Sequence, residues 1–563
     1  MATSSMDEIF DKAMRSHQAG QLSQAEALYR AILESHPDHA GSLTMLGMLL
    51  SDSGRADEAI ETIGKALALH PEMVEAHINL GSALRRIGRG DEAVASFRRA
   101  IALAPAALNA HFNLGNALMD LDRSAEAAEC YREAVRLAPE MAECHYGLGR
   151  ALRLTGQFEE AIAALRQAIA LRADHAAAYD ALGSVACDLG QWPQAIAFHG
   201  EAIRLDPQGG GYHTNLGIAL YNSGELLAAE GCFRWAIGLR EDDVLAHFNL
   251  AAILLRTGRL AQGWQEYEWR RRLAGFPPLN TTRPEWQGEP LDGKTILLYG
   301  EQGLGDTLQF ARYAVMASEA GARVVLAVQP ALVGLLRSVP GVTATVALGE
   351  TTTADCHLPL LSAPRVFGTE VSTIPAPVPY ITADPGAAAR WGERLAGAEG
   401  LKVGLVWAGD PRPGDRGANL VDRRRSLRLE QFAPLGAIPG VTLVSLQKGT
   451  PAAQIKSAPE GLRLIDLMDE VRDFGDTAAL VANLDLVICV DTSVAHLVGA
   501  MGKPVWILSR FDGCWRWLLD RDDSPWYPSA RLFRQITPGD WTDTVAEVAA
   551  ALRRLAQTGK AEG

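Results

Sequence analysis

The amino-acid sequence predicts an all-α solenoid of repeats followed by an α/β region with two parallel sheets. The solenoid is predicted by a 34-residue period that runs through the first half of the chain. The α/β region is predicted by apolar, β-branched runs that alternate with helical patterns after residue 293. Between the two, residues 273–292 lose all periodicity and are rich in proline and glycine, which is typical of a domain boundary.

The repeats are marked by residues that return at the same spacing. A Leu-Gly pair occurs at 46–47, 80–81, 114–115, 148–149, 182–183 and 216–217, and Leu250-Ala251 continues the series. Alanine keeps the period at 25, 59, 93, 127, 161, 195 and 229, and proline keeps it at 37, 71, 105, 139 and 207. Glycine at 20, 54, 88, 156, 190, 224 and 258 marks turns. These marks resemble the tetratricopeptide repeat (TPR), in which two antiparallel helices cross at a small residue and proline stops the second.

The resemblance implies a TPR superhelix over residues 6–272, with seven repeats and a final helical pair, whose concave face binds a protein or peptide. Asparagine precedes the Leu-Gly position at Asn79, Asn113, Asn215 and Asn249. This ladder resembles the asparagines that clamp the acceptor polypeptide in O-GlcNAc transferase, and surface polarity is the alternative. Histidines share another repeat position, at His77, His111, His145, His213 and His247. We expect them to fill a slot for a bulky aromatic side chain, because successive repeats lie too far apart for a shared metal ion.

Composition narrows the function classes. A net charge of −14 favours neither nucleic-acid binding nor a polybasic membrane surface. The seven cysteines form no CxxC pair, which suits a reducing compartment. Residues 1–30 have no apolar signal region, and no apolar run is long enough to span a membrane. We therefore expect a cytoplasmic protein without a membrane span.

After the boundary, the sequence predicts strands at 295–300, 323–328, 342–348 and 356–361, and then at 402–409, 441–447, 462–466, 484–490 and 505–509. Two such blocks predict two Rossmann-like domains that face a cleft, at 293–385 and 400–540, with a closing helix at 541–557. Trp264, Trp269 and Trp286 are expected to pack the end of the solenoid against these domains.

Two strand ends carry the polar residues of a candidate site. The strand at 486–490 ends in Asp491, Thr492 and Ser493, which are N-cap residue types before a helix, so this is either an anion site or an ordinary capped turn. The first strand ends in the glycine loop Gly303-Leu304-Gly305-Asp306. A dinucleotide site is disfavoured because Leu308 stands where a third small residue is needed, and the chain has no P-loop pattern.

The stretches GLGDTLQFARY (303–313) and CVDTSVAHLVGAMGKPVWIL (489–508) together resemble glycosyltransferase family 9, the heptosyltransferase-like enzymes. The resemblance covers residues 294–540 and implies a GT-B fold. With the repeats, the plan is similar to that of O-GlcNAc transferase and of bacterial repeat-bearing flagellin glycosyltransferases. It implies an inverting glycosyltransferase that moves a sugar from a nucleotide-sugar to an acceptor, a protein recruited by the TPR domain.

The resemblance assigns roles to residues. Asp306 matches the proposed general base, and its other possible role is to cap the helix at residue 307. Asp491, Thr492, Ser493 and His496 match the donor-binding motif, although His496 could instead be a core histidine. Gly303 and Gly305 belong to the same donor site through the glycine loop.

Cationic residues at the same edge would neutralise the diphosphate. Lys448 is the best single candidate, Gln447 could read the nucleobase, and Arg425 closes the arginine run of the loop at 410–430. Heptosyltransferases place a lysine where this loop has arginines, which argues against heptose as the sugar. The aromatic segment 510–535 either stacks on a ligand or covers the edge of the sheet.

No metal-ligand constellation and no cofactor is predicted, because helix dipoles and cationic side chains serve the leaving group in GT-B enzymes and the nucleotide-sugar is a co-substrate. Two alternatives stay open. The chain could be a TPR interaction scaffold with a catalytically inactive domain, or a transferase that acts on a saccharide or lipid-linked acceptor.

Overall fold

The computed structural model describes residues 6–209, 211–276, 281–412, 414 and 416–559. The chain divides into two compact units, Met1–Ala219 and Leu220–Gly563. Of the predicted segments, parts of the boundary at 273–292 and of the loop at 410–430 fall on residues 277–280, 413 and 415, outside the described residues.

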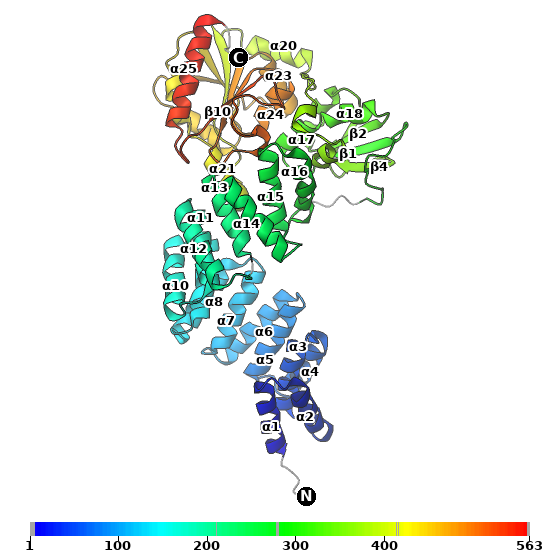
Figure 1. The fold of residues 1–563 in the computed structure, drawn as a ribbon, viewed down its shortest axis with the longest axis vertical. Helices are drawn as coiled ribbons and strands as arrows, with labels where there is room; N and C mark the ends of the chain where they lie inside the picture. Colours follow the sequence, from blue (N-terminus) through cyan, green and yellow to red (C-terminus); the bar gives the residue numbers. More distant parts are fainter. Residues whose placement is uncertain (1–5, 210, 277–280, 413, 415, 560–563) are drawn as a thin grey trace. The chain divides into compact units, whose positions relative to one another are not determined.

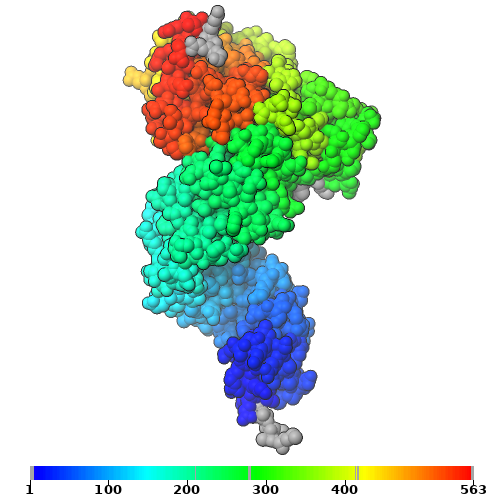
Figure 2. All heavy atoms as spheres, viewed as in Figure 1, coloured from blue at the N-terminus to red at the C-terminus, as the bar shows by residue number. Residues whose placement is uncertain are grey.

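The first unit consists of antiparallel helical pairs. Its helices are α1 (Met6–Gln18), α2 (Leu22–Ser35), α3 (Ala40–Asp52), α4 (Ala56–Leu69), α5 (Val74–Arg86), α6 (Gly90–Leu103), α7 (Leu108–Asp120), α8 (Ser124–Leu137), α9 (Ala142–Leu154), α10 (Phe158–Leu171), α11 (Ala176–Asp188) and α12 (Trp192–Leu205). In Figure 2 the atoms of this unit follow one another in sequence order, from blue to cyan. α13 (Tyr212–Ser223) crosses into the second unit.

The periodic glycines serve two different needs. All the glycines predicted to mark turns have a positive φ, between 71° and 95°, which costs glycine little because it has no Cβ. The glycine of each of the first five Leu-Gly pairs makes room for a large side chain of the next helix. A Cβ added at Gly81 would lie 2.7 Å from the ring of Phe97, and one at Gly115 would lie 2.8 Å from the ring of Tyr131. The predicted small residue at the helix crossing is therefore a packing requirement.

The second unit begins with α14 (Leu226–Leu239), α15 (Val244–Arg256), α16 (Leu260–Tyr267) and a 3-10 turn, η1 (Glu268–Arg272). The first α/β part follows, with β1 (Thr295–Tyr299), α17 (Leu304–Phe310), α18 (Tyr313–Glu319), β2 (Arg323–Val328), η2 (Pro330–Leu332), η3 (Leu335–Ser338), β3 (Val342–Ala347), β4 (Cys356–Pro359), η4 (Leu360–Ser362), α19 (Ala363–Val366), η5 (Val371–Thr373) and α20 (Pro385–Arg394). Figure 1 shows α17 and α18 beside β1 and β2.

The second α/β part contains β5 (Leu401–Val406), α21 (Arg416–Arg425), η6 (Leu429–Phe432), α22 (Ala433–Gly436), β6 (Val441–Ser445), η7 (Thr450–Ser457), β7 (Leu464–Asp466), α23 (Phe474–Ala482), β8 (Leu486–Val490), α24 (Ser493–Ala500), β9 (Val505–Ser509), η8 (Trp515–Trp517), β10 (Ala530–Arg534) and α25 (Thr542–Thr558). α25, red in Figure 1, packs Val545, Val548 and Leu552 into the core of the second sheet.

Both sheets are parallel and share one topology. The first has the strand order β3-β2-β1-β4 and the second has the order β10-β9-β8-β5-β6-β7. In the second sheet the first three strands run outward from β5 and the next three run outward from β8, which is the strand order of a Rossmann sheet. The first sheet repeats the beginning of that order. The strand order therefore reverses between β1 and β4 in the first sheet and between β5 and β8 in the second, and ligands bind at such points in these folds.

The helices that precede the α/β parts share a core with them. Trp264 of α16 is 1 % exposed, and its ring lies edge-on to Trp515 at 5.3 Å and Phe310 at 6.2 Å. Its indole N–H donates to the carbonyl of Thr369 at 3.0 Å. The predicted boundary at 273–292 marks the change of secondary structure, whereas the compact division lies earlier, between residues 219 and 220.

Three local features differ from the sequence prediction. The loop predicted at 410–430 contains the helix α21, and the arginine run forms the last turn of that helix. The helix predicted from residue 307 begins at Leu304. The segment 510–535 contains an edge strand, β10, which sequence inspection missed.

Candidate functional site

A cavity of about 1070 Å³ opens at the carboxyl ends of the strands of both sheets. It is lined by the loops that follow β1, β5, β6, β8 and β9. All ten residues predicted for catalysis and donor binding line this one cavity: Gly303, Gly305, Asp306, Arg425, Gln447, Lys448, Asp491, Thr492, Ser493 and His496. The structure thus brings the predicted set together, and the chemical role of each residue stays a prediction.

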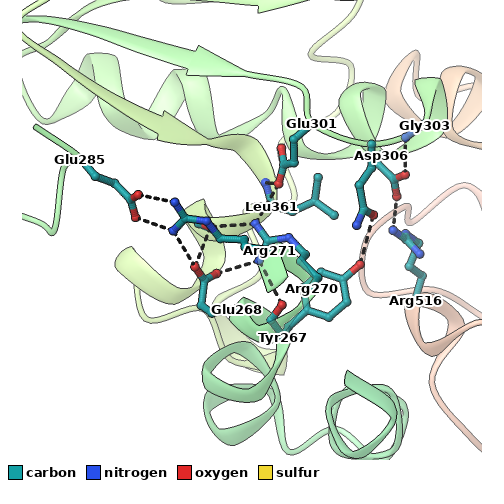
Figure 3. Close-up of polar contacts among 12 residues, drawn as sticks. Tyr267, Glu268, Arg270, Arg271, Glu285, Glu301, Gly303, Asp306, Leu361 and Arg516 are labelled. Carbon is teal, nitrogen blue, oxygen red and sulfur yellow. Dashed lines mark hydrogen bonds and ion pairs between the residues drawn. The ribbon is translucent and has the colours of Figure 1, made fainter. Parts of the chain in front are cut away.

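Asp306 lies in the first turn of α17, which begins because Gly303 acts as its N-cap. The Oδ2 atom of Asp306 accepts a hydrogen bond from the amide of Gly303 at 2.9 Å. Its Oδ1 atom accepts one from the guanidinium of Arg516, which follows β9 (Figure 3). The Asp306 carboxylate, on the third residue of α17, therefore fixes the glycine loop. It also binds Arg516, which belongs to the second α/β part.

Gly305 sits where two helices meet. A Cβ at this position would lie 2.8 Å from Cδ2 of His496 and 3.3 Å from Cα of Ser493. Both neighbours belong to α24, so the missing side chain lets α17 approach α24 closely. Gly305 thereby sets the spacing between the two halves of the cavity.

His496 is both a cavity residue and a buried one, 5 % exposed. Its ring stacks on Trp517 at 5.5 Å, and its Nδ1 atom shares a hydrogen bond with the hydroxyl of Tyr527 at 3.0 Å. Burial holds the pKa of His496 well below 6.5, and the positive charges of Arg516 and Arg312 lower it further. The imidazole is therefore neutral at physiological pH.

The start of α24 carries the predicted donor-phosphate residues. Thr492 is the N-cap, and its buried Oγ1 has no hydrogen-bond partner among the described residues. The carbonyl of Asp491 accepts from Nη1 of Arg425 at 3.2 Å, which ties α21 to this turn. The helix N-terminus and Arg425 thus bring positive charge to one place.

Gln447 has its hydrogen-bonding capacity taken by the main chain. Its Oε1 accepts from the amides of Trp407 at 3.1 Å and Ala408 at 2.9 Å, and its Nε2 donates to the carbonyls of Ala408 and Lys448. Since an amide side chain has four such positions, Gln447 braces the loops after β5 and β6 and offers no free edge to a nucleobase. The ammonium of Lys448 donates to the carbonyl of Val471, and the residue as a whole is exposed at the cavity.

Arginines that the sequence did not single out also line the cavity. They are Arg412, Arg472, Arg510 and Arg516. Arg510 directly follows β9, so the rule that ligands bind at carboxyl strand ends could have identified it. Arg424 of the predicted run points elsewhere, because it pairs with Asp512 at 3.2 Å and with Asn222.

A buried ion-pair network fixes the loop after β1 (Figure 3). Arg270 of η1 is 0 % exposed and donates to Glu301 Oε1 and Ser362 Oγ, both at 2.8 Å, and to Glu268 at 2.8 Å. Arg271 forms a bidentate pair with Glu285 at 2.7 and 3.0 Å. Burial raises the pKa of Glu301, while Arg270 opposes that rise.

The aromatic segment 510–535 is part of the core. Trp515, Trp517, Trp526 and Tyr527 are each at most 7 % exposed. The expectation that these rings cover the sheet edge fits their burial better than stacking on a ligand does.

The ladders of the repeats have local roles. The Nε2 atoms of His77, His111 and His145 bond the carbonyls of Pro71, Pro105 and Pro139 at 2.8–2.9 Å. These histidines therefore tie each helix to the turn before it. Asn215 donates to both carboxylate oxygens of Asp180 at 3.0 Å, and Asn249 donates to the carbonyl of Leu245.

Comparison with known proteins agrees with the repeat architecture. The family model described as "Cilia and flagella-associated protein 70 C-terminal domain", a TPR model, matches residues 45–281. The matched span begins within α3 and includes the helices from α4 to α16, which follow the 34-residue period. Within the described residues, about the first 260 positions of the chain form an all-helical TPR solenoid.

The TPR chain is also similar to individual proteins. It is 30% identical to Protein FlbA of Caulobacter vibrioides over 346 residues, which is 56% of this chain and 56% of FlbA, so it spans about half the length of that relative. Among solved structures it is similar to a TPR protein from Parabacteroides merdae (16% identity, TM-score 0.38, 44% of this chain and 98% of that one). It is also similar to the Cut9–Hcn1 complex (18% identity, TM-score 0.38, 48% and 53%).

Such a solenoid is an interaction scaffold for proteins or peptides. In the described part of the chain, no helix combines the length and the apolar character that crossing a membrane requires.

Proposed function

We propose that this TPR protein is an inverting glycosyltransferase of GT-B organisation, which transfers a sugar from a nucleotide-sugar to a protein in the cytoplasm. One observation carries the proposal: a single cavity at the reversal points of two Rossmann-ordered sheets gathers Asp306, the start of α24 and several cations. The solenoid would present the acceptor polypeptide.

The cavity offers the groups that such a transfer needs. Asp306 would take the proton from the acceptor hydroxyl, whose oxygen then attacks the anomeric carbon on the face opposite the leaving diphosphate. That geometry inverts the configuration. The diphosphate would lie at Thr492 and Ser493, where the helix N-terminus, Arg425 and Lys448 stabilise the charge that develops. The neutral His496 serves there as a hydrogen-bonding group and not as a cation.

The proposal is tested with Asp306→Asn in the full chain. The variant should lose transfer by about 10² to 10⁴-fold or more, since a positioned base contributes that much, and should still bind the nucleotide. Transfer is read from the intact mass of candidate acceptor proteins from cells with and without the protein. Binding is read by titration with UDP, GDP, CDP, ADP and dTDP. Unchanged turnover in the variant would remove Asp306 from the mechanism.

A second candidate is a TPR scaffold whose α/β region is catalytically inactive. The observation that favours it is that both carboxylate oxygens of Asp306 already accept hydrogen bonds. Failure of every nucleotide in the panel to bind would support the scaffold.

A further inference from the structure

Arg516 holds the oxygen that the proposed base needs. Oδ2 of Asp306 accepts a hydrogen bond from the amide of Gly303, and Oδ1 accepts one from the Arg516 guanidinium. A carboxylate accepts a proton on one of these two oxygens. In this arrangement an acceptor hydroxyl would have to compete with the positively charged guanidinium of Arg516 for a hydrogen bond to Oδ1 of Asp306.

Arg516 is built to reach across the cavity. It belongs to η8, between β9 and β10 of the second sheet, whereas Asp306 belongs to α17 of the first α/β part. Its Nε donates to Gln309 Oε1 at 2.7 Å and its Nη1 lies 3.1 Å from Cys514 Sγ, while the guanidinium lies 4.1 Å above the ring of Trp515. The side chain is 11 % exposed and lines the same cavity as Thr492 and Ser493.

A second buried guanidinium, that of Arg312, acts on the same histidine as Arg516, because the positive charges of both lower the pKa of His496. Arg312 is 2 % exposed, and the partners that the structure describes for it are the carbonyls of Gln309, Pro375 and Trp526 and the hydroxyl of Tyr380. Arg516, in contrast, pairs with the carboxylate of Asp306. The burial of Arg516 disfavours its charge, but Asp306 more than compensates, so the pKa of Arg516 lies above its ordinary value.

We propose that Arg516 is a latch that exchanges Asp306 for the diphosphate of the donor, so that the base is released only when the donor is bound. The inference rests on the proposed function. A guanidinium suits this exchange because its planar donors fit a carboxylate and a phosphate equally well. With the diphosphate held by Arg516, Oδ1 of Asp306 becomes available to the acceptor.

The step balances. The acceptor hydroxyl gives its proton to Oδ1 of Asp306, and its oxygen forms the bond to the anomeric carbon. The bond from that carbon to the diphosphate oxygen breaks, and its electron pair leaves with the diphosphate. Arg516 then neutralises the leaving group, and its return to Asp306 after product release restores the resting state.

The latch is tested by calorimetric titration of the full chain with the five nucleoside diphosphates above and with inorganic pyrophosphate. Because the donor no longer competes with the carboxylate, Asp306→Asn should bind the preferred nucleotide at least fivefold more tightly than the wild type. Arg516→Gln should weaken binding by about tenfold or more. In the Arg516→Gln background, Asp306→Asn should have no further effect.

A matched control and a conservative variant complete the design. Glu285→Gln removes a bidentate pair to Arg271 in the same unit, away from the cavity lining, and should leave the affinity unchanged. Arg516→Lys keeps the charge but not the fork, and its affinity should lie between those of the wild type and Arg516→Gln. If the wild type binds a nucleotide and Asp306→Asn binds it equally or more weakly, the latch is refuted while the proposed function stands. If no probe binds to the wild type, both are refuted.

Discussion

Breaking the buried pair between Arg270 and Glu301 should destabilise the second unit strongly. Both side chains are 0 % exposed, and Arg270 also donates to Ser362 and Glu268. Arg270→Met keeps much of the volume but leaves the Glu301 carboxylate buried without its cation. Removing one partner of such a pair costs about 3–5 kcal/mol, because the remaining charge is uncompensated.

The loss should depend on pH in a defined direction. Burial already raises the pKa of Glu301 above its ordinary value of 4.5, and Arg270 opposes that rise. Without Arg270 the folded-state pKa rises further, so the folded chain holds this proton more firmly than the unfolded chain does. Its stabilising contribution is then complete below the unfolded value and is lost as pH rises through the folded value. The deficit of Arg270→Met should therefore be smaller near pH 5 than near pH 7.5.

Urea unfolding followed by tryptophan fluorescence measures this effect, because eleven of the twelve tryptophans lie after residue 219. The double variant Arg270→Met/Glu301→Gln should recover most of the loss, since no buried charge is left unpaired. Arg271→Met is the matched control. That side chain is 34 % exposed, so its pair with Glu285 should contribute at most about 1 kcal/mol. A deficit below about 1 kcal/mol for Arg270→Met, or one independent of pH, would refute the reasoning.

Two further predictions concern the contact between α17 and α24. Gly305→Ala places a Cβ 2.8 Å from His496 and should lower the free energy of unfolding in urea by about 1–3 kcal/mol. Gly231→Ala in α14 is the control, because the space around Gly231 is open, and it should be neutral or stabilising. Equal effects of the two substitutions would contradict the close approach of α17 to α24. Because the pKa of His496 is lower in the folded chain than in the unfolded chain, the unfolded chain binds a proton at His496 that the folded chain does not bind. The free energy of unfolding should therefore fall as the pH drops below 6.5. His496→Gln should remove that part of the acid dependence, and an unchanged pH profile would show that His496 does not contribute it.

The solenoid could be predicted from sequence because each repeat packs only on its neighbours, so local spacing carries the information. The alternating strands were predictable for a similar reason, since buried parallel strands are apolar runs. Strand β10 was missed because ARLFR (Ala530–Arg534) places arginines between its apolar residues, as an edge strand can, and follows a loop rich in aromatic residues.

The cavity lining was largely predictable because the carboxyl ends of parallel strands meet at one edge of a sheet. What each side chain does there was not. Gln447 looked free to read a base, but the amides of Trp407 and Ala408 occupy it, and that contact depends on how two loops fold together. The pair between Arg516 and Asp306 joins residues 210 positions apart, on elements of two different sheets, and no local pattern indicates it.

The same network shows where the chain is best divided. The hydroxyl of Tyr267 donates to Gln302 Oε1 at 3.3 Å, and Arg270 holds the neighbouring Glu301, so helices classed by sequence with the solenoid position the loop that enters the cavity. A division at 273–292 would separate Glu301 from its only described cation and expose the buried face of Trp264. A division near residue 219 leaves both intact. The last helical pair therefore belongs, in energetic terms, to the α/β region, and it links the repeat scaffold to the candidate site.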